Sequence, residues 1–302
     1  MKKLLMGILM SIALYSHSQT IDRANVPYPL FRDPIYDGAA DANLIWNDQT
    51  NEWWLFYTQR RANVSTQGTG WCYGSDIGIG ISGDNGKTWR YFGIAEGLKK
   101  GQDPGHNTYW APCVRKFGDT YHMFVTYVPG IQFDWRGAGQ IAHYTSKNLW
   151  DWKKVENVPL EIDVIDPTVH ALPNGEYGLW YTHKGDTWMA ISKNLKKWKT
   201  VGKPIITGIN HEAPIVFQMG GSYWMITDPR GDYNGLAVYK SSDCMNWERK
   251  SDLLLGGHAD VAVCGDKAYI VYFRHFEKEH HSRSSAIYLS EIAIKNGELV
   301  AL

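Results

Sequence analysis

One short pattern occurs five times along the chain, and this repetition limits the folds that the chain can adopt. Each copy has an opening residue, then alanine or proline, then apolar residues, and an aromatic-rich segment follows about eleven residues after the opening residue. The five opening residues are Asp41, Trp110, Asp166, Glu212 and His258. A repeat at such intervals predicts an array of similar β units.

A second repeat supports the first. Four segments rich in Ser, Asp, Asn and Gly each follow a predicted strand and end in a tryptophan. Such residues favour tight turns because their side chains bond the nearby backbone. The preceding strands are expected at residues 77–81, 141–145, 187–191 and 236–240, and a short outer strand is expected to start at each tryptophan. These tryptophans, which are expected in the core, are Trp89, Trp152, Trp198 and Trp247.

Each unit is thus predicted to contain four antiparallel strands, which is the composition of a propeller blade. We predict an all-β, five-bladed β-propeller formed by one domain, residues 19–302. The fifth unit lacks the turn and tryptophan, and is expected to end with strands at 287–294 and 298–302. Residues 29–36 are expected to add a strand that closes the ring. Insertions at 60–74, 96–109 and 129–138 are expected to form one rim.

The N-terminus indicates export. Met1-Lys2-Lys3 precedes a short apolar run and then small polar residues up to Ser18. This order is typical of a secretory signal peptide, so residues 1–18 are predicted to be cleaved and the protein to reach the periplasm. The formal net charge of +0 gives no reason to expect nucleic acid or a membrane surface as a partner. The chain has 4 cysteines, and their spacing matches no zinc-site pattern.

Three of the five opening residues are carboxylates, and a radial array would bring them to one axis. Hydrolysis of a glycosidic bond needs a carboxylic acid that protonates the leaving oxygen and a second carboxylate that acts as base or nucleophile. A third carboxylate near the acid raises its pKa by repulsion between like charges. Asp41, Asp166 and Glu212 are therefore the candidate catalytic residues. If the fold alone determined the opening residue, the same residue would be expected in all five copies, whereas the opening residue varies.

At these motifs the chain resembles the family 43 glycoside hydrolases, which are five-bladed propellers. The matching segments begin at Trp110, Asp166, Glu212 and His258. The resemblance implies an inverting mechanism with Asp41 as base, Asp166 as pKa modulator and Glu212 as acid. It also implies an exo-acting enzyme that releases an arabinofuranose-like or xylose-like sugar from plant or algal oligosaccharides.

One part of the motif differs from that family, whose first blade usually reads Asp-Pro. Here Ala42 follows Asp41, and an Asp-Pro pair occurs upstream at Asp33. The distance from Asp41 to its aromatic-rich strand fits the repeat, so Asp41 is favoured as the base.

Other polar and aromatic residues are candidates for substrate binding. They are Trp110, His258, Arg274, His211 and His170, with His183, Asp228, Arg230 and His275 as further strand-end residues. No cofactor is expected to be required, although the resemblance implies that a calcium ion or a water can lie near His258.

Two other functions are compatible with the sequence. The related family 117 hydrolases of algal galactans use a histidine as acid, for which His211 would serve. A glycan-binding propeller without catalysis is the alternative from another class, and it predicts the loss of an axial carboxylate.

Overall fold

The computed structural model describes residues 19–98, 107–135, 138–231, 235–276 and 283–302. The described chain forms five antiparallel sheets and one short 3₁₀ helix, η1 (Arg23–Asn25). Blade one contains β2 (Ala39–Asn47), β3 (Glu52–Gln59), β4 (Asp76–Ser82) and β5 (Arg90–Ile94). Blade two contains β6 (Thr108–Phe117), β7 (Thr120–Val128), β8 (Gln140–Ser146) and β9 (Lys153–Asn157).

The remaining blades repeat this order. Blade three contains β10 (Val164–Ala171), β11 (Tyr177–His183), β12 (Asp186–Ser192) and β13 (Trp198–Thr200). Blade four contains β14 (His211–Met219), β15 (Ser222–Pro229), β16 (Leu236–Ser241) and β17 (Glu248–Leu253). Blade five contains β18 (Gly257–Cys264), β19 (Lys267–His275) and β20 (Ser285–Lys295), whose outer edge pairs with both β21 (Glu298–Ala301) and β1 (Phe31–Arg32).

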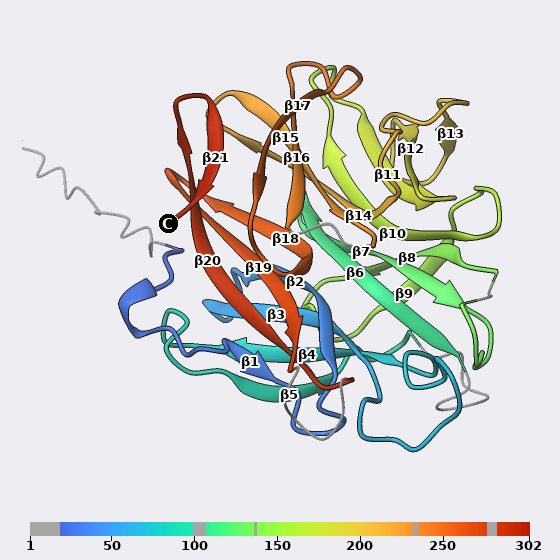
Figure 1. The fold of residues 1–302 in the computed structure, drawn as a ribbon, viewed down its shortest axis with the longest axis vertical. Helices are drawn as coiled ribbons and strands as arrows, with labels where there is room; N and C mark the ends of the chain where they lie inside the picture. Colours follow the sequence, from blue (N-terminus) through green and yellow to red (C-terminus); the bar gives the residue numbers. More distant parts are fainter. Residues whose placement is uncertain (1–18, 99–106, 136–137, 232–234, 277–282) are drawn as a thin grey trace, which may run out of the picture.

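The five sheets form a closed ring. The first strand of each blade, β2, β6, β10, β14 or β18, contacts the first strands of both neighbouring blades. These inner strands run near the middle of the molecule, whereas β5, β13 and β21 lie at its periphery (Figure 1). The predicted all-β fold with five blades is confirmed.

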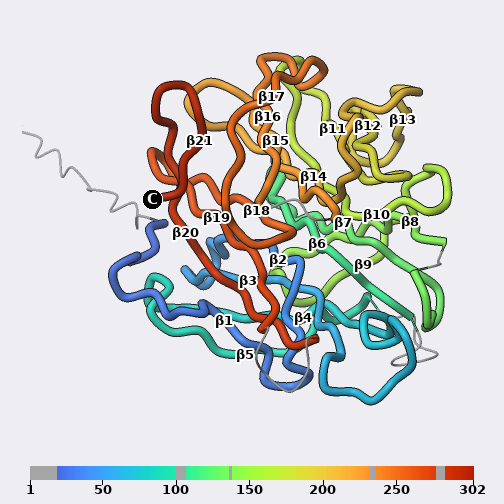
Figure 2. The backbone as a smooth tube through the Cα atoms, viewed as in Figure 1, coloured from blue at the N-terminus to red at the C-terminus, as the bar shows by residue number. Residues whose placement is uncertain are grey.

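The N-terminal segment closes the ring, as the sequence predicts. Phe31 and Arg32 pair with Ile287 and Ala286 of β20, so the first and last parts of the described chain lie side by side (Figure 2). The backbone N–H of Ile21 also donates to the Tyr269 hydroxyl at 3.0 Å. The closure matters because an open ring would leave strand edges unpaired.

Apolar and aromatic side chains fill the spaces between adjacent blades. One cluster joins blades one and two, and others join the following pairs around the ring. Among the turn tryptophans, Trp152 is buried in this core, whereas Trp89, Trp198 and Trp247 are only partly buried and pack at its edge. The prediction of core tryptophans is therefore confirmed in full for Trp152 alone.

Each inner strand contains a β-bulge, and the five bulges give the true register of the repeat. The pairing shifts between residues 40 and 43, 110 and 113, 165 and 168, 212 and 215, and 257 and 260. In each bulge one residue has a positive φ, between 41° and 57°. These five equivalent residues are Asp41, Ala111, Asp166, Ala213 and His258.

The predicted equivalence was therefore wrong by one residue in two blades. Trp110 and Glu212 directly precede the bulge residues Ala111 and Ala213 rather than occupying that position themselves. A bulge re-aims the side chains beside it. It can therefore turn Asp41, Asp166 and His258 towards the axis, whereas Glu212 comes from the neighbouring position.

Polar side chains block the ring axis beneath the bulges. Asp260 is 2% exposed and accepts hydrogen bonds from Asn43 Nδ2 at 2.6 Å and from the Leu44 backbone at 3.2 Å. Arg115 Nη2 donates to the same carboxylate at 2.6 Å. We refer to Asn43, Arg115 and Asp260 as the axial plug. It separates the space at one end of the axis from the space at the other.

The fold gives little information on the predicted export of the protein. The predicted signal peptide, residues 1–18, lies outside the described residues. In the described part of the chain, no helix has the length and apolar character to cross a membrane. The four cysteines are all free thiols.

Candidate active site

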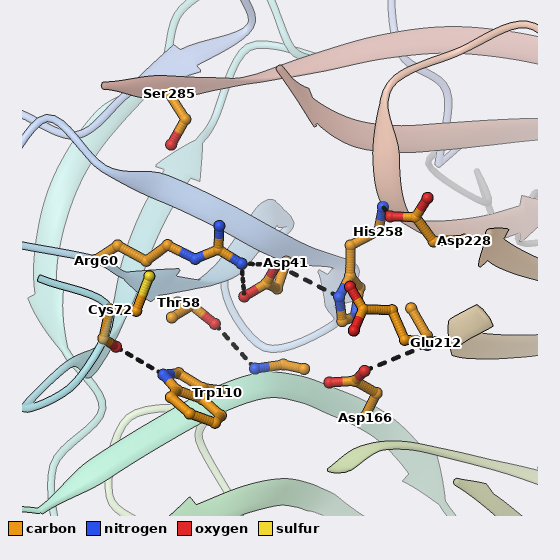
Figure 3. A network of polar contacts seen from close by, with 12 residues as sticks. Asp41, Thr58, Arg60, Cys72, Trp110, Asp166, Glu212, Asp228, His258 and Ser285 are labelled. Carbon is orange, nitrogen blue, oxygen red and sulfur yellow. Dashed lines mark hydrogen bonds and ion pairs between the residues drawn. The ribbon is translucent and has the colours of Figure 1, made fainter. Parts of the chain in front are cut away.

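A cavity of ≈ 610 Å³ lies at the end of the axis where the bulges are. Its lining includes all three candidate catalytic residues, Asp41, Asp166 and Glu212, together with His258. The carboxylates come from blades one, three and four, and they point into one space (Figure 3). The cavity is within the usual size range of small-ligand sites.

Asp41 is buried and held as an anion. It is 3% exposed, Arg60 Nη2 donates to its two oxygens at 2.8 and 3.1 Å, and His258 Nδ1 lies 3.3 Å from Oδ1. Burial alone would raise the pKa of Asp41, but Arg60 and then His258 outweigh it, so the pKa lies below its usual value. Such a carboxylate is suited to accept a proton.

Asp166 has the opposite character. Its backbone N–H donates to Thr126 Oγ1 at 2.9 Å, and its Oδ2 accepts the backbone N–H of Ala213 at 3.3 Å. Burial, together with the charges of Glu212 and Asp41 and against the opposing effect of His258, raises the pKa of Asp166 to about 7. Two carboxyl groups at one site thus favour different protonation states.

Glu212 is the most accessible of the three carboxylates, with its side chain 30% exposed. Arg230 directs two donors, Nε at 2.9 Å and Nη2, at a single oxygen, Oε2. Arg230 is itself 47% exposed, so a ligand in the cavity can reach it.

His258 is a buried partner of the carboxylates. Burial would lower its pKa, but Asp41, followed by Asp166 and Glu212, raises it above the usual value. The positive imidazolium therefore balances part of the negative charge at the axis.

The calcium ion that the resemblance implies near His258 stays a prediction. Calcium is held by six to eight oxygen ligands. Here His258 Nδ1 faces Asp41, and no group of three or more His, Cys, Asp or Glu side chains within the described ranges could hold a metal.

One wall of the cavity is aromatic. Trp110 donates through Nε1 to the Cys72 carbonyl at 2.7 Å, and its ring lies edge-on to Tyr73 and Trp135 with centroids 4.7 and 6.5 Å away. Tyr73 and Trp135 belong to the first and third predicted insertions, which thus build the same rim. Trp110 is fixed on this wall, with its ring available to the apolar face of a sugar.

Neither the strand-end residues His183 and His275 nor three further candidates for substrate binding line this cavity. His211 is fully buried, with Nε2 2.7 Å from Thr187 Oγ1 and Nδ1 beside the Ile209 carbonyl. This placement gives no support to His211 as the acid of a family 117 enzyme.

The other two residues lie elsewhere on the propeller. His170 lines a separate cavity at the far side of the axial plug, because it lies four residues beyond Asp166 on the same strand. The guanidinium of Arg274 lies over the rings of Tyr272 and Tyr288, at 5.4 and 5.7 Å. Neither His170 nor Arg274 is therefore placed to contact a ligand in the cavity that holds the three carboxylates.

Asp33, the alternative to Asp41 as base, lies outside the cavity. Asp33 is buried at 2% exposure and accepts hydrogen bonds from Tyr57 at 2.8 Å and Gln59 at 2.9 Å. It ties the closing segment to blade one and does not line the cavity, whereas Asp41 does.

Several charged residues of the cavity lie at the ends of second strands. Asp228 and Arg230 were expected there, and both line the cavity. Arg60 and Lys184 also line it, and neither was singled out from the sequence. Arg60, Lys184 and Arg230 occupy equivalent positions, each directly after the last residue of β3, β11 or β15 and two residues after Thr58, Thr182 or Asp228. This repeated position was the signal that could have identified them.

A hydrogen bond between adjacent blades recurs at this level. Thr58, Thr126 and Thr182 accept the backbone N–H of the next blade's bulge residue at 2.9, 2.9 and 3.1 Å. In blade four Asp228 Oδ2 takes the place of the threonine and accepts the His258 N–H at 2.9 Å. In blade five the equivalent residue is Phe273, and the Arg60 guanidinium lies 4.9 Å from its ring centroid.

Comparisons with known proteins add to this geometry. No family model matches the chain, and no curated protein matches it by sequence. Solved structures do match. One is a family 43 β-xylosidase/α-arabinofuranosidase from a compost microbial metagenome in complex with xylotriose, with TM-score 0.69 and 13% identity over 91% of this chain and 96% of that one. The chain has the fold of the family 43 glycoside hydrolases.

Other structures with this fold act on different sugars. A family 43 β-1,3-galactosidase with galactodeoxynojirimycin has TM-score 0.68 and 14% identity, over 87% of this chain and 93% of that one. An exo-1,5-α-L-arabinanase from a bovine ruminal metagenomic library has TM-score 0.66 and 15% identity, over 90% of this chain and 99% of that one. At such identities the likeness concerns the fold, so the function of this chain depends on its own cavity.

Proposed function

We propose that this protein is an inverting, exo-acting glycoside hydrolase that releases a terminal sugar from plant or algal oligosaccharides. The observation that carries the proposal is the convergence of Asp41, Asp166 and Glu212 on one cavity, in three different charge environments. This cavity shares no lining residue with the cavity at the other end of the axis, so it is open at one end of the ring only, which favours entry of a chain end over the middle of a polymer. The aromatic wall offers a surface for the C–H face of the sugar.

In the proposed reaction Asp41 is the base. Arg60 and His258 keep its carboxylate ionised, so it removes a proton from the water that attacks the anomeric carbon. The glycosidic oxygen leaves with a proton from Glu212. Arg230 donates to Oε2 of Glu212, so the leaving group has to displace Arg230 before this oxygen can transfer that proton. Asp166, whose pKa is about 7, supplies little negative charge below neutral pH and more above it.

The sugar is proposed to be arabinofuranose-like or xylose-like. Solved structures with this fold include enzymes named for xylose, arabinose and galactose, so the panel in the test has to cover all three. We further propose that the protein acts after export, with residues 1–18 as its signal peptide. A mature N-terminus determined by mass spectrometry that retains these residues would contradict export by this route.

The test is turnover of 4-nitrophenyl α-L-arabinofuranoside, β-D-xyloside and β-D-galactoside, with natural oligosaccharides beside them. Glu212→Gln and Asp41→Asn should each lower kcat by about 10²-fold or more, the scale of general acid–base catalysis. Glu248→Gln is the matched control, because Glu248 is exposed and pairs with Lys250 away from the cavity. NMR of the first product formed should show the inverted anomer.

Two results would refute the proposal. One is sugar binding without turnover in the wild-type protein, which indicates a glycan-binding propeller. The other is turnover that survives both cavity substitutions, which would place the chemistry elsewhere.

A further inference from the structure

Asp228 has no role in the reaction proposed above, yet it lies in the same cavity. Its Oδ2 accepts the His258 backbone N–H, as Figure 3 shows, and this is the one hydrogen bond to its side chain among the described residues. The other oxygen, Oδ1, therefore has no protein donor in the described part of the chain. A carboxylate with a spare oxygen in a polar cavity is a candidate acceptor for a ligand.

The architecture of the ring shows that this carboxylate is not needed for the fold. Blades one, two and three make the same inter-blade hydrogen bond with a neutral threonine hydroxyl. Burying a carboxylate is more costly than burying a hydroxyl. Burial raises the pKa of Asp228 to about 6, and the nearby charges of Glu212 and Asp41 contribute, opposed by His258. Blade four thus makes this hydrogen bond with Asp228, whose carboxylate costs more to bury than the threonine hydroxyl of the first three blades.

The adjacent blade is adapted to Asp228. A Cβ atom on Gly257 would lie 2.6 Å from Asp228 Oδ2, so with any other residue at position 257 the Asp228 carboxylate would have to shift. The equivalent positions of the other four blades carry larger residues, namely Ala40, Trp110, Ile165 and Glu212. Asp228 in blade four and Gly257 in blade five therefore both differ from the residues at the equivalent positions of the other blades. Together they allow a carboxylate to lie in the cavity.

We propose that Asp228 is a substrate-binding residue whose free carboxylate oxygen accepts a hydrogen bond from a hydroxyl of the bound sugar. This inference rests on the proposed function and deepens it, because it adds a residue that selects which sugar the cavity holds. Sugars with a hydroxyl at the junction of blades four and five bind well, and those without it bind poorly. A hydrogen bond to a charged acceptor is stronger than one between neutral groups.

The test uses the residue that the other blades carry. Asp228→Thr keeps an acceptor for the His258 N–H but removes the free carboxylate oxygen, and Asp228→Asn keeps the shape without the charge. On the glycoside that the wild-type protein cleaves, each variant should raise KM by about ten- to a hundredfold and change kcat much less. Asp228→Thr should unfold at the same temperature as the wild type at pH 8, or at a higher one.

Single-deoxy versions of the same glycoside identify the hydroxyl. Removing the hydroxyl that Asp228 binds should raise the KM of the wild-type protein. It should raise the KM of Asp228→Thr little further, because the two changes remove the same interaction. An unchanged KM in Asp228→Thr, additive losses for every deoxy sugar, or a lower unfolding temperature would each overturn the role of Asp228 while wild-type turnover still supports the hydrolase. A wild-type protein that neither binds nor cleaves any sugar overturns both.

Discussion

Arg60 provides the most direct test of the assignment of Asp41 as base. Its Nη2 lies 2.8 and 3.1 Å from the two oxygens of Asp41, and both side chains are largely buried. Replacing Arg60 with Gln leaves burial opposed mainly by His258, so the pKa of Asp41 should rise. An opposite charge at this distance typically changes a carboxyl pKa by about 1–3 units.

The consequence for catalysis has a definite sign. A base must be ionised, so activity falls as the pH drops through its pKa, and a higher pKa moves the acidic limb of the profile to higher pH. The shift of about 1–3 units corresponds to a loss of about 10- to 1000-fold in kcat/KM well below the pKa, with a smaller loss at pH 8. The assay is kcat/KM from pH 4 to 9, with circular dichroism at each pH to confirm that the variant is folded.

The second cavity arginine is a matched control. Arg230 occupies the position of blade four that Arg60 occupies in blade one, but it pairs with Glu212. Arg230→Gln should leave the acidic limb in place, because Arg230 pairs with Glu212 and not with Asp41. If folded Arg60→Gln keeps the wild-type acidic limb, or if both variants move the same limb, Asp41 does not act as the base assigned here.

Two further predictions concern stability. Because the pKa of Asp166 is raised to about 7, its ionisation opposes folding at pH 8 but only slightly at pH 4, where the carboxyl is neutral in the folded state and only partly ionised in the unfolded state. Asp166→Asn should therefore stabilise the fold by a few kcal/mol at pH 8, at about 1.4 kcal/mol per pKa unit, and by little at pH 4; urea unfolding showing equal effects at both pH values would contradict this. In the axial plug, Asp260→Leu leaves the Arg115 charge without its carboxylate partner and should cost about 3–5 kcal/mol. The double variant Asp260→Leu/Arg115→Met should recover the part of that loss that is due to the unpaired Arg115 charge, but not the part due to the Asn43 and Leu44 donors that Asp260 also satisfies. No recovery in the same assay would contradict the assigned cost of the unpaired Arg115 charge.

The sequence carries the blade pattern because the blades are similar in their packing. Each blade buries an aromatic-rich second strand such as β3, and each turn before an outer strand uses the same polar residues, so the repeat is visible without coordinates. The candidate carboxylates could be found for the same reason, since they lie at fixed places in this repeat.

The register was predicted less well because the inner strands are bulged. Alignment on opening residues placed Glu212 at the level of Asp41, whereas Pro112, Pro167 and Pro214 share one position and give the correct alignment. The roles of Arg60 and Asp228 could not be predicted from spacing alone. They depend on which side chain meets which across two blades, and a linear pattern does not contain that information.

The bulges also show how catalytic groups can be placed on a repeated scaffold. A positive φ in a residue other than glycine costs about 1–3 kcal/mol and often marks a functional site. Here all five blades adopt it, including Ala111 and Ala213, which carry no functional group. The strain therefore belongs to the ring itself and is no argument for the function of Asp41 or Asp166. What distinguishes those two residues is the identity of the side chain at a position that the fold already directs to the axis.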